Sequence, residues 1–202
     1  MNRVIIGLVG EQCAGKEKFW ELLCGVTAEY LKDNFVFTIN RFSTSVMLAE
    51  ILDRCGAPTS RQNKIALVKE LEEKFGEGTV VAGLYRRLET DKTTIKVIDS
   101  IRLHADEEAL RRKTWNILLY ITAEKEVRYR RSKERARDPQ DQKMTIEEFE
   151  AIENTPTEIN VPYIGARADW KIENNESDEV ALKNKVREFF TNQVAPLLTK
   201  EG

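Results

Sequence analysis

Apolar and polar residues alternate along this chain in blocks that predict strands separated by helices. Val4–Val9 is a nearly unbroken apolar run, which is typical of a strand buried on both faces of a parallel sheet. Further strands are predicted at Phe35–Ile39, Thr94–Asp99, Ile117–Ile121 and Trp170–Ile172. Apolar residues at helical spacing predict helices starting near Lys16, within Arg41–Ala57, over Gln62–Phe75, Thr79–Glu89, Ala105–Arg112 and Glu124–Arg137, from Thr145, and after Ser177.

This alternation predicts an α/β protein with an open, five-stranded parallel sheet between two helical layers. Right-handed crossovers would bring the carboxyl ends of all strands to one edge, where ligands bind. Three helices between the second and third strands exceed what a crossover needs. We therefore expect one domain over residues 1–202, with a substrate-holding helical insertion at about 41–92. Helices that only cover the sheet are the alternative.

The segment from Gly10 to Lys16 reads Gly-Glu-Gln-Cys-Ala-Gly-Lys between the first strand and the first helix. Strand, glycine-bounded turn, lysine and helix make up the layout of a phosphate-binding loop. Glycines let backbone N–H groups approach the phosphates, the helix adds its positive end, and Lys16 adds a full charge. Glu17 stands where the motif has Ser or Thr, and Lys18 follows it. A turn that binds no ligand is the alternative.

Asp99 and Arg102 follow the third strand and would lie at the same edge as this loop. A carboxylate at a strand end can hold magnesium, so Asp99 is a candidate metal ligand, with a helix cap as the alternative. The planar guanidinium of Arg102 could grip a phosphate, with a surface ion pair as the alternative.

A dense group of arginines forms the second basic feature of the chain. Arg128, Arg131 and Arg135 recur at spacings of three and four and share one helix face, and Arg137 follows them. Beside the polar segment 138–142, they fit a lid that closes over phosphates, at about residues 128–165, in which one or two of the four are essential. A solvated charged helix is the alternative.

Charge and cysteine content narrow the class of protein. The chain has 202 residues, of which 33% are charged, yet its net charge is only −2. That balance argues against a general binder of nucleic acid or of membrane surfaces. Three cysteines without metal spacing indicate reduced thiols in a cytoplasmic protein. No apolar run approaches the roughly 18 residues that cross a membrane, and the N-terminal run lacks the layout of a signal peptide.

Four stretches together resemble the P-loop kinases of the nucleoside monophosphate kinase (adenylate kinase-like) and dephospho-CoA kinase group. They are Gly10 to Lys16, Ser43 to Leu48 (Ser-Thr-Ser-Val-Met-Leu), Val97 to Arg102 (Val-Ile-Asp-Ser-Ile-Arg), and the arginine-rich helix followed by Ala168 to Asn174. The resemblance covers nearly the whole chain. It implies a three-layer P-loop NTPase-type fold, ATP as phosphoryl donor with Mg²⁺, and a small phosphorylated acceptor.

The resemblance also implies roles for individual residues. The expected ATP-binding residues are Gly10, Cys13, Ala14, Gly15, Lys16, Glu17, Lys18, Arg128 and Asn174. The expected catalytic residues are Lys16, Asp99, Arg102, Arg131 and Arg137. The expected acceptor-binding residues are Arg41, Ser43, Arg54, Arg87 and Arg102, and the expected magnesium ligands are Asp99 and Glu17.

Departures from the family pattern leave more than one function open. Adenylate kinases have Gly-Thr where Glu17 and Lys18 stand, and Asp and Arg where Val46 and Ala49 stand. The first hypothesis is ATP-dependent phosphoryl transfer to a nucleoside monophosphate or a similar acceptor. The alternatives are a catalytically impaired, nucleotide-binding regulatory protein and a dephospho-CoA kinase-like enzyme. No nucleic-acid or membrane partner is expected, and the sequence leaves the acceptor and the oligomeric state open.

Overall fold

The computed structural model describes residues 2–30, 38–99, 101–135 and 143–199. Within them the strands form one five-stranded parallel sheet in the order β2-β3-β1-β4-β5, which confirms the predicted fold class. The strands are β1 (Val4–Val9), β2 (Ile39–Phe42), β3 (Ile95–Ile98), β4 (Asn116–Thr122) and β5 (Trp170–Glu173). Because β1 pairs with both β3 and β4, it lies at the centre, and all six of its residues are buried.

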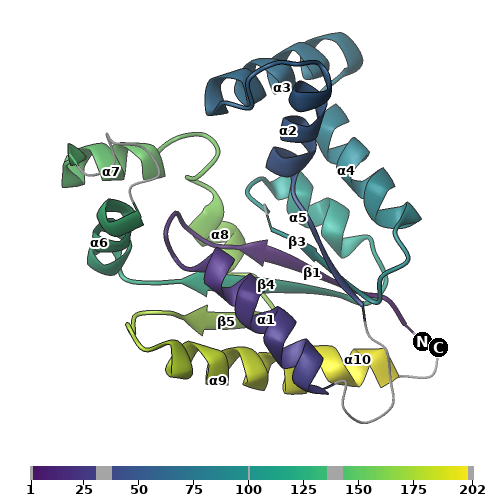
Figure 1. Ribbon diagram of the computed structural model, residues 1–202, viewed down its shortest axis with the longest axis vertical. Helices are drawn as coiled ribbons and strands as arrows, with labels where there is room; N and C mark the ends of the chain where they lie inside the picture. The colour runs from purple at the N-terminus through teal and green to yellow at the C-terminus, as the bar shows by residue number, and fades with distance from the viewer. Residues whose placement is uncertain (1, 31–37, 100, 136–142, 200–202) are drawn as a thin grey trace.

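Helices cover both faces of the sheet (Figure 1). Their bounds are α1 (Lys16–Tyr30), α2 (Thr44–Arg54), α3 (Arg61–Phe75), α4 (Thr79–Thr90), α5 (His104–Arg111), α6 (Lys125–Arg135), α7 (Ile146–Glu153), α8 (Val161–Gly165), α9 (Glu179–Phe189) and α10 (Ala195–Thr199), with a π-helical turn at Phe190–Val194. Helices α1, α9 and α10 pack on one face and share a core with it. Helices α4, α5 and α8 contribute to the core on the other face.

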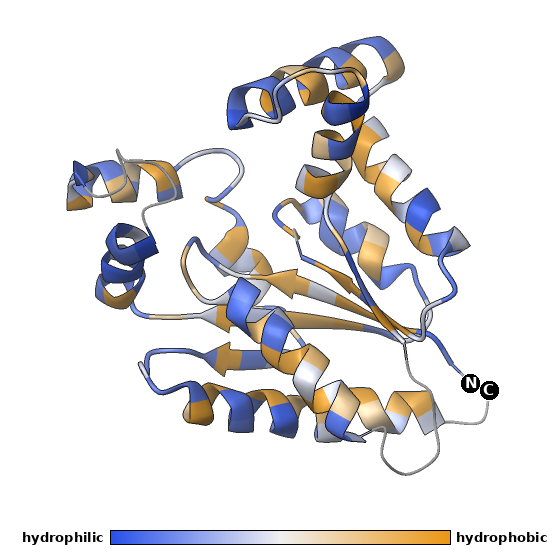
Figure 2. Cartoon of the chain, viewed as in Figure 1, coloured by the Kyte–Doolittle hydropathy of each residue, from blue (hydrophilic) through white to orange (hydrophobic). Residues whose placement is uncertain are grey.

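The colouring by hydropathy follows these two cores (Figure 2). The central strands are mostly apolar, with Lys96 in β3 and Asn116 and Thr122 in β4 as exceptions, whereas α6 is mostly hydrophilic and α3 has no buried residue. Helices α6 and α7 lie beyond the arrowheads of β4 and β1, and α2 and α3 extend away from the sheet on the other side of the same edge (Figure 1). The carboxyl edge of the sheet is therefore bordered by two helical regions, each of which pairs a hydrophilic helix, α6 or α3, with one of mixed polarity, α7 or α2.

The second strand differs from the prediction. It was expected at Phe35–Ile39, but the structure places β2 at Ile39–Phe42, and residues 31–37 lie outside the described part. Because β2 is an edge strand, only one side of it pairs, and polar Asn40 and Arg41 are tolerated there. A search for apolar runs finds central strands and misses this kind of edge strand. The shift puts Arg41 within the sheet.

The boundaries of most predicted helices agree closely with the structure, whereas α8 was not predicted and the predicted last helix is divided by a π-helical turn into α9 and α10. The predicted capping box forms at α7, where Thr145 Oγ1 accepts from Glu148 N at 3.2 Å and Thr145 N donates to Glu148 Oε2 at 2.8 Å. Three helices, α2 to α4, lie between β2 and β3, as predicted. Their role in holding an acceptor stays a prediction, as do the lid role of residues 128–165 and the single-domain organisation. In the described residues no helix is both long enough and apolar enough to span a membrane.

Substitution of Gly165 tests the packing of α8 on the sheet. A Cβ at this position would lie 2.7 Å from three atoms of the Tyr120 ring. Gly165→Ala should therefore lower the free energy of unfolding by about 1–3 kcal/mol, the usual cost of overpacking a core. Urea denaturation measures the change.

Gly25→Ala is the matched control, because a Cβ at exposed Gly25 in α1 meets nothing within 4 Å. Alanine is the better helix former, so this variant should be neutral or more stable by up to about 1 kcal/mol. Equal stability of the two variants would contradict the close contact between α8 and Tyr120.

Candidate phosphate-binding site

The loop from Gly10 to Lys16 joins the carboxyl end of β1 to the first residue of α1. Two of its residues have positive φ, Cys13 at 59° and Gly15 at 106°. Left-handed residues in a loop turn successive N–H groups toward one side and create an anion-binding concavity. The loop also lies tightly on its neighbours, since a Cβ on Gly10 would be 2.2 Å from the Ile121 carbonyl oxygen. The glycines are thus required by close approach and by backbone conformation.

The ammonium group of Lys16 folds back onto the loop. Its Nζ donates to the carbonyl oxygen of Glu11 at 2.8 Å and also to that of Gly10. Burial lowers the pKa of Lys16 to about 8, and the nearby positive charge of Arg102 adds to this effect. A phosphate would offer the ammonium a full negative charge in place of two carbonyl dipoles. The position therefore suits an anion that this lysine could bind.

Asn174, the residue after β5, also holds the phosphate loop in place. Its Nδ2 donates to Ala14 O at 2.8 Å, and Asn174 is only 4% exposed. Arg131 of α6 in turn donates to the carbonyl oxygens of Asn174 at 2.8 Å and of Glu176 at 3.0 Å. The loop, the β5–α9 connection and α6 are thereby linked. Arg131 thus supports the loop through its contact with Asn174. Its predicted catalytic role stays a prediction.

A second cluster joins α1, β2 and β3 through the guanidinium of Arg41. Its NH1 and NH2 donate to the two carboxylate oxygens of Glu17 at 2.7 and 2.9 Å. Its Nε donates to Asp99 Oδ2 at 2.6 Å. The bond from Arg41 holds the pKa of Glu17 below its usual value. Arg41, expected to bind the acceptor, thus contacts the two expected magnesium ligands.

Glu17 introduces a charge that the Ser or Thr of the usual motif does not carry. Two unit charges about 4 Å apart interact by about 4 kcal/mol at an effective dielectric constant of about 20. An unpaired carboxylate at this point would oppose a triphosphate by a similar amount. The ion pair with Arg41 removes much of that repulsion, because the guanidinium neutralises the carboxylate on the side of β2.

Arg102 lies between the loop and the segment that follows α7. Its guanidinium pairs with Glu158, which is 9% exposed. Burial lowers the pKa of Arg102, and the positive charge of Arg61, the first residue of α3, lowers it further. The charge of Arg102 acts on Lys16 and that of Arg61 acts on Arg102, while the carboxylate of Asp99 acts on Lys16 and Arg102 in the opposite direction. An anionic ligand would act on these cations in the same direction as Asp99.

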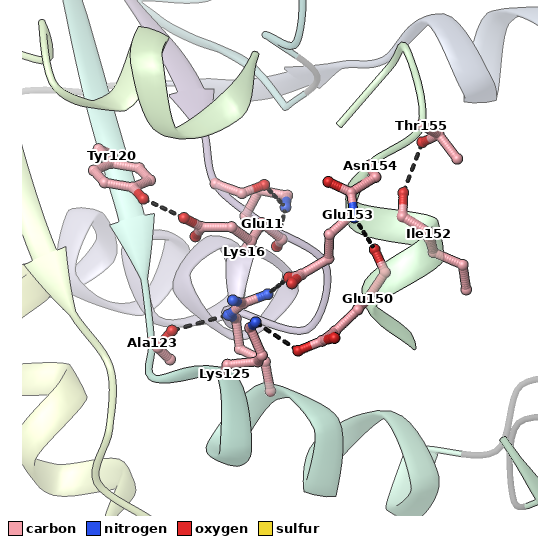
Figure 3. Close-up of polar contacts among 12 residues, drawn as sticks. Glu11, Lys16, Tyr120, Ala123, Lys125, Glu150, Ile152, Glu153, Asn154 and Thr155 are labelled. Atoms are coloured by element: carbon pink, nitrogen blue, oxygen red, sulfur yellow. Dashed lines mark hydrogen bonds and ion pairs between the residues drawn. The ribbon is translucent and has the colours of Figure 1, made fainter. Parts of the chain in front are cut away.

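Glu11 and Tyr120 form a contact that the sequence analysis did not identify. The hydroxyl of Tyr120, near the end of β4, donates to Glu11 Oε1, and Figure 3 shows this contact beside Lys16. The second oxygen, Glu11 Oε2, is buried and has no hydrogen-bond partner within the described residues. Burial raises the pKa of Tyr120, and the bond to Glu11 adds to the shift. In the sequence, Glu11 stands at a position where the phosphate-loop motif accepts any residue, so the motif did not mark it as a site residue.

The remaining arginines of α6 lie at different places. Arg128 is buried, donates to Ala123 O at 2.9 Å and pairs with Glu153, so it ties α6 to α7. Figure 3 shows Glu150 and Glu153 of α7 facing the start of α6, where Lys125 pairs with Glu150 at 2.7 Å. Arg135 is exposed, and its charge acts on Glu17. Arg137 lies outside the described residues.

The other expected acceptor residues belong to the helical insertion. Ser43 is buried at the start of α2, and Arg54 is exposed in its last turn. Arg87 of α4 pairs with Glu50 of α2 at 2.7 Å. These contacts hold α2 and α4 together, and none of those described for the three residues reaches the phosphate loop. Their role toward an acceptor stays a prediction.

A cavity of about 480 Å³ adjoins the loop on the side of α6 and α9. Its lining includes Lys18, Arg130, Arg131, Asn174 and Leu182, together with the acidic residues Glu134, Glu176, Asp178 and Glu179. Lys18 itself pairs with Glu179 at 2.7 Å and with Glu21 at 3.2 Å. The cavity combines one apolar side chain, two guanidinium groups, an ammonium group and four carboxylates, and it includes Asn174, which holds Ala14. Because it lies beside the residue that holds the loop, it is a candidate site for the uncharged base and ribose of a nucleotide.

Glu17 and Asp99 are the groups that fit magnesium. Within the described residues no group of three or more His, Cys, Asp or Glu side chains could hold a metal by itself. Magnesium is commonly bound by one or two carboxylates together with substrate phosphates. The two carboxylates that share Arg41 meet this requirement in number and in type of donor atom.

Comparisons with solved structures identify the fold. Shikimate kinase from Bacteroides thetaiotaomicron superposes with a TM-score of 0.59 and 14% identity, over 93% of this chain and 97% of that one. Shikimate kinase from Acinetobacter baumannii, in complex with shikimate, gives 0.55 and 17%, over 95% and 96%. The chain has the fold of the small P-loop kinases.

A third similar structure is that of TT1252 from Thermus thermophilus, with a TM-score of 0.58 and 19% identity over 95% of this chain and 98% of that one. No family model and no curated protein matches the sequence. At these identities the comparisons establish the fold of the chain and leave its activity open.

Several site residues were missed by sequence reasoning. They are Glu11, Trp20, Arg61, Tyr120, Glu153 and Glu158. The spacing of Trp20 three residues after Glu17 was a usable signal, because both lie on one face of α1. Glu158 and Arg61 gave no comparable signal, since their approach to Arg102 depends on how α7, α8 and α3 fold back toward the sheet.

The titration of Lys16 tests the electrostatics of the loop. Its pKa of about 8 lies below the 10.5 of an ordinary lysine, so between these values the unfolded chain binds more protons. Stability should therefore rise with pH through this window as far as Lys16 contributes. Carbon-13 NMR of the Lys16 side chain, assigned by its loss in Lys16→Met, measures the pKa.

Arg102→Met should raise the pKa of Lys16, because it removes the second-largest cause of the shift. A Lys16 that titrates near 10.5 in the unaltered protein would contradict the burial of its ammonium group. A Lys16 that is indifferent to Arg102 would contradict their proximity.

Proposed function

We propose that this chain transfers the γ-phosphoryl group of ATP to a nucleoside monophosphate or a similar small phosphorylated acceptor. The observation that carries the proposal is the placement of Lys16 and Arg102 beside a loop whose backbone is shaped for phosphates, on the fold of the small P-loop kinases. Phosphoryl transfer chiefly requires that the protein position the reacting groups and supply positive charge around the phosphates, and this edge of the sheet can do both.

Each group has a task that its surroundings support. The N–H groups of the loop and Lys16 would hold the β- and γ-phosphates of ATP, and the cavity beside Asn174 would hold its base and ribose. Arg102, positioned by Glu158, would orient the transferred phosphoryl group. Magnesium, held by Asp99 and Glu17, would neutralise the charge that develops on the phosphates.

The acceptor is proposed to be anionic because of the charges that face it. Arg102 and Arg61 act on each other at the end of the sheet nearest the helical insertion, and Arg54 and Arg87 add charge on that insertion. A phosphate on the acceptor would pair with such groups through planar, two-point hydrogen bonds. Two of the similar structures are shikimate kinases, so shikimate, an acceptor with a carboxylate, is the comparison substrate to test.

A nucleotide-binding protein with impaired catalysis is the second candidate. It is favoured by one observation, the Glu17–Arg41 ion pair at the position where the usual motif has a neutral hydroxyl. In that case ATP would bind without turnover, and the bound state would serve regulation. The dephospho-CoA kinase-like reading differs only in the acceptor and is tested by the same experiment.

An acceptor screen tests the proposal. ADP release is followed in a coupled assay with ATP, Mg²⁺ and, in turn, nucleoside monophosphates, deoxynucleoside monophosphates, dephospho-CoA and shikimate. We expect turnover with one member of the monophosphate set. Lys16→Ala should weaken ATP binding about 10- to 100-fold, the effect of losing a charged hydrogen-bond donor worth about 1.5–3 kcal/mol.

Lys171→Ala is the control for this substitution, since Lys171 pairs with Glu173 on the exposed side of β5. It should leave ATP binding unchanged. Calorimetry with ATP and Mg²⁺ then separates the two candidates: binding without any turnover favours the regulatory protein. Absence of ATP binding would contradict both.

A further inference from the structure

The Arg41 cluster is more elaborate than a surface ion pair. One guanidinium makes three hydrogen bonds, two to Glu17 at 2.7 and 2.9 Å and one to Asp99 at 2.6 Å. The side chain of Asp99 is 11% exposed and that of Arg41 is 24% exposed. Glu17 is 48% exposed, much like Arg187 and Glu29 of a surface pair at 48% and 44%, so the difference lies in Arg41 and Asp99. Arg41 is therefore partly removed from water between two carboxylates that would otherwise repel each other.

Three elements fix the position of this guanidinium. Strand β2 carries Arg41, the residue after β3 supplies Asp99, and the first turn of α1 supplies Glu17. The ring of Trp20 on α1 lies against the guanidinium, with a distance of 5.8 Å from Cζ to the ring centroid. Because Glu17 and Trp20 are three residues apart on α1, their side chains lie on the same face of the helix and both contact Arg41. Such an arrangement holds a cation in a defined place.

The two carboxylates are also the groups suited to a divalent metal. Glu17 follows the loop lysine, where the usual motif supplies a metal ligand, and Asp99 ends the neighbouring strand. Magnesium binding by carboxylates requires their oxygens to be available. Here both oxygens of Glu17 and Oδ2 of Asp99 already accept hydrogen bonds from Arg41. A metal ion and Arg41 would thus compete for the same oxygens.

We propose that Arg41 is a built-in cation at the metal position of the phosphate loop, which pairs with both Glu17 and Asp99, offsets one of their two negative charges and excludes free divalent ions from them. The inference rests on the proposed function in one respect, because only a site for Mg²⁺ and ATP gives Glu17 and Asp99 a metal to bind. The contacts of Arg41 with these two carboxylates, however, are present in the free protein. A divalent ion would enter only by displacing Arg41, with the phosphates of the nucleotide supplying the additional oxygens.

Binding of Mn²⁺ alone, without nucleotide, tests the inference directly. Mn²⁺ is an oxygen-preferring ion whose free concentration can be followed by electron paramagnetic resonance. The unaltered protein should bind it weakly. Arg41→Met, which removes the charge but keeps an unbranched side chain beside Trp20, should bind it at least about tenfold more tightly, equivalent to about 1.4 kcal/mol. The double variant R41M/E17Q should lose this gain.

Arg187→Met is the matched control. It removes an arginine from another ion pair of α1, the one with Glu29, which Lys183 also contacts at 2.6 Å. It should not change the binding of Mn²⁺. Circular dichroism and thermal unfolding check that each variant is folded. Arg41→Lys provides a further step, because one ammonium cannot reproduce the forked contact with Glu17, and it should bind Mn²⁺ with intermediate affinity.

The outcomes separate this inference from the proposed function. If the unaltered protein binds Mn²⁺ as tightly as Arg41→Met does, the inference is overturned, whether or not the chain is a kinase. If Arg41→Met does not fold, the unaltered protein decides alone: Mn²⁺ binding that E17Q abolishes overturns the inference, and weak binding that E17Q leaves unchanged supports it. Failure of the acceptor screen leaves the Mn²⁺ result unaffected, because no ATP or turnover enters the measurement.

Discussion

The parallel pairing of β1 with β3 and β4 is the constraint on which the rest of the site depends. All six residues of β1 are buried, and the registers run from Val4 opposite Ile95 to Val9 opposite Tyr120. This pairing fixes the height at which the chain leaves the sheet and turns into the phosphate loop. Asp99 at the end of β3 and Asn174 at the end of β5 then reach the same edge. Residues 160 positions apart, Ala14 and Asn174, can therefore share a hydrogen bond.

Three cations at this edge are paired within the free protein. Arg41 has Glu17 and Asp99, Arg102 has Glu158, and Lys16 has two loop carbonyl groups. Partly buried charges require such partners, because an unpaired one would carry a large desolvation cost. A phosphate ligand would compete with these partners for the same cations. The free site is thus stabilised by the contacts that its ligands would have to replace.

Most elements of the fold could be predicted because their signals are local. The central strand β1 is a buried, nearly unbroken apolar run, and the first turn of α7 has a capping box that depends on two residues three positions apart. Edge strand β2 was misplaced because it contains Asn40 and Arg41, and the pairing with β3 that holds it is not visible along the chain. The arginine-rich helix was found, but its arginines have different roles: Arg128 is buried against Glu153, whereas Arg131 braces Asn174. Spacing along a helix shows which side chains share a face and does not show which element that face meets.

The sequence by itself determined the class of fold, the order of its elements and the loop at the end of β1, because apolar periodicity and glycine placement act over a few residues. It also identified Asp99, Arg102 and Glu17 as charged groups near that loop. Only the tertiary structure decided how these charges pair. Arg41 is held by residues 17, 20 and 99, and the partner of Arg102 comes from the segment after α7. Electrostatic pairing depends on distances of a few ångströms, which are set by how the helices pack on the sheet.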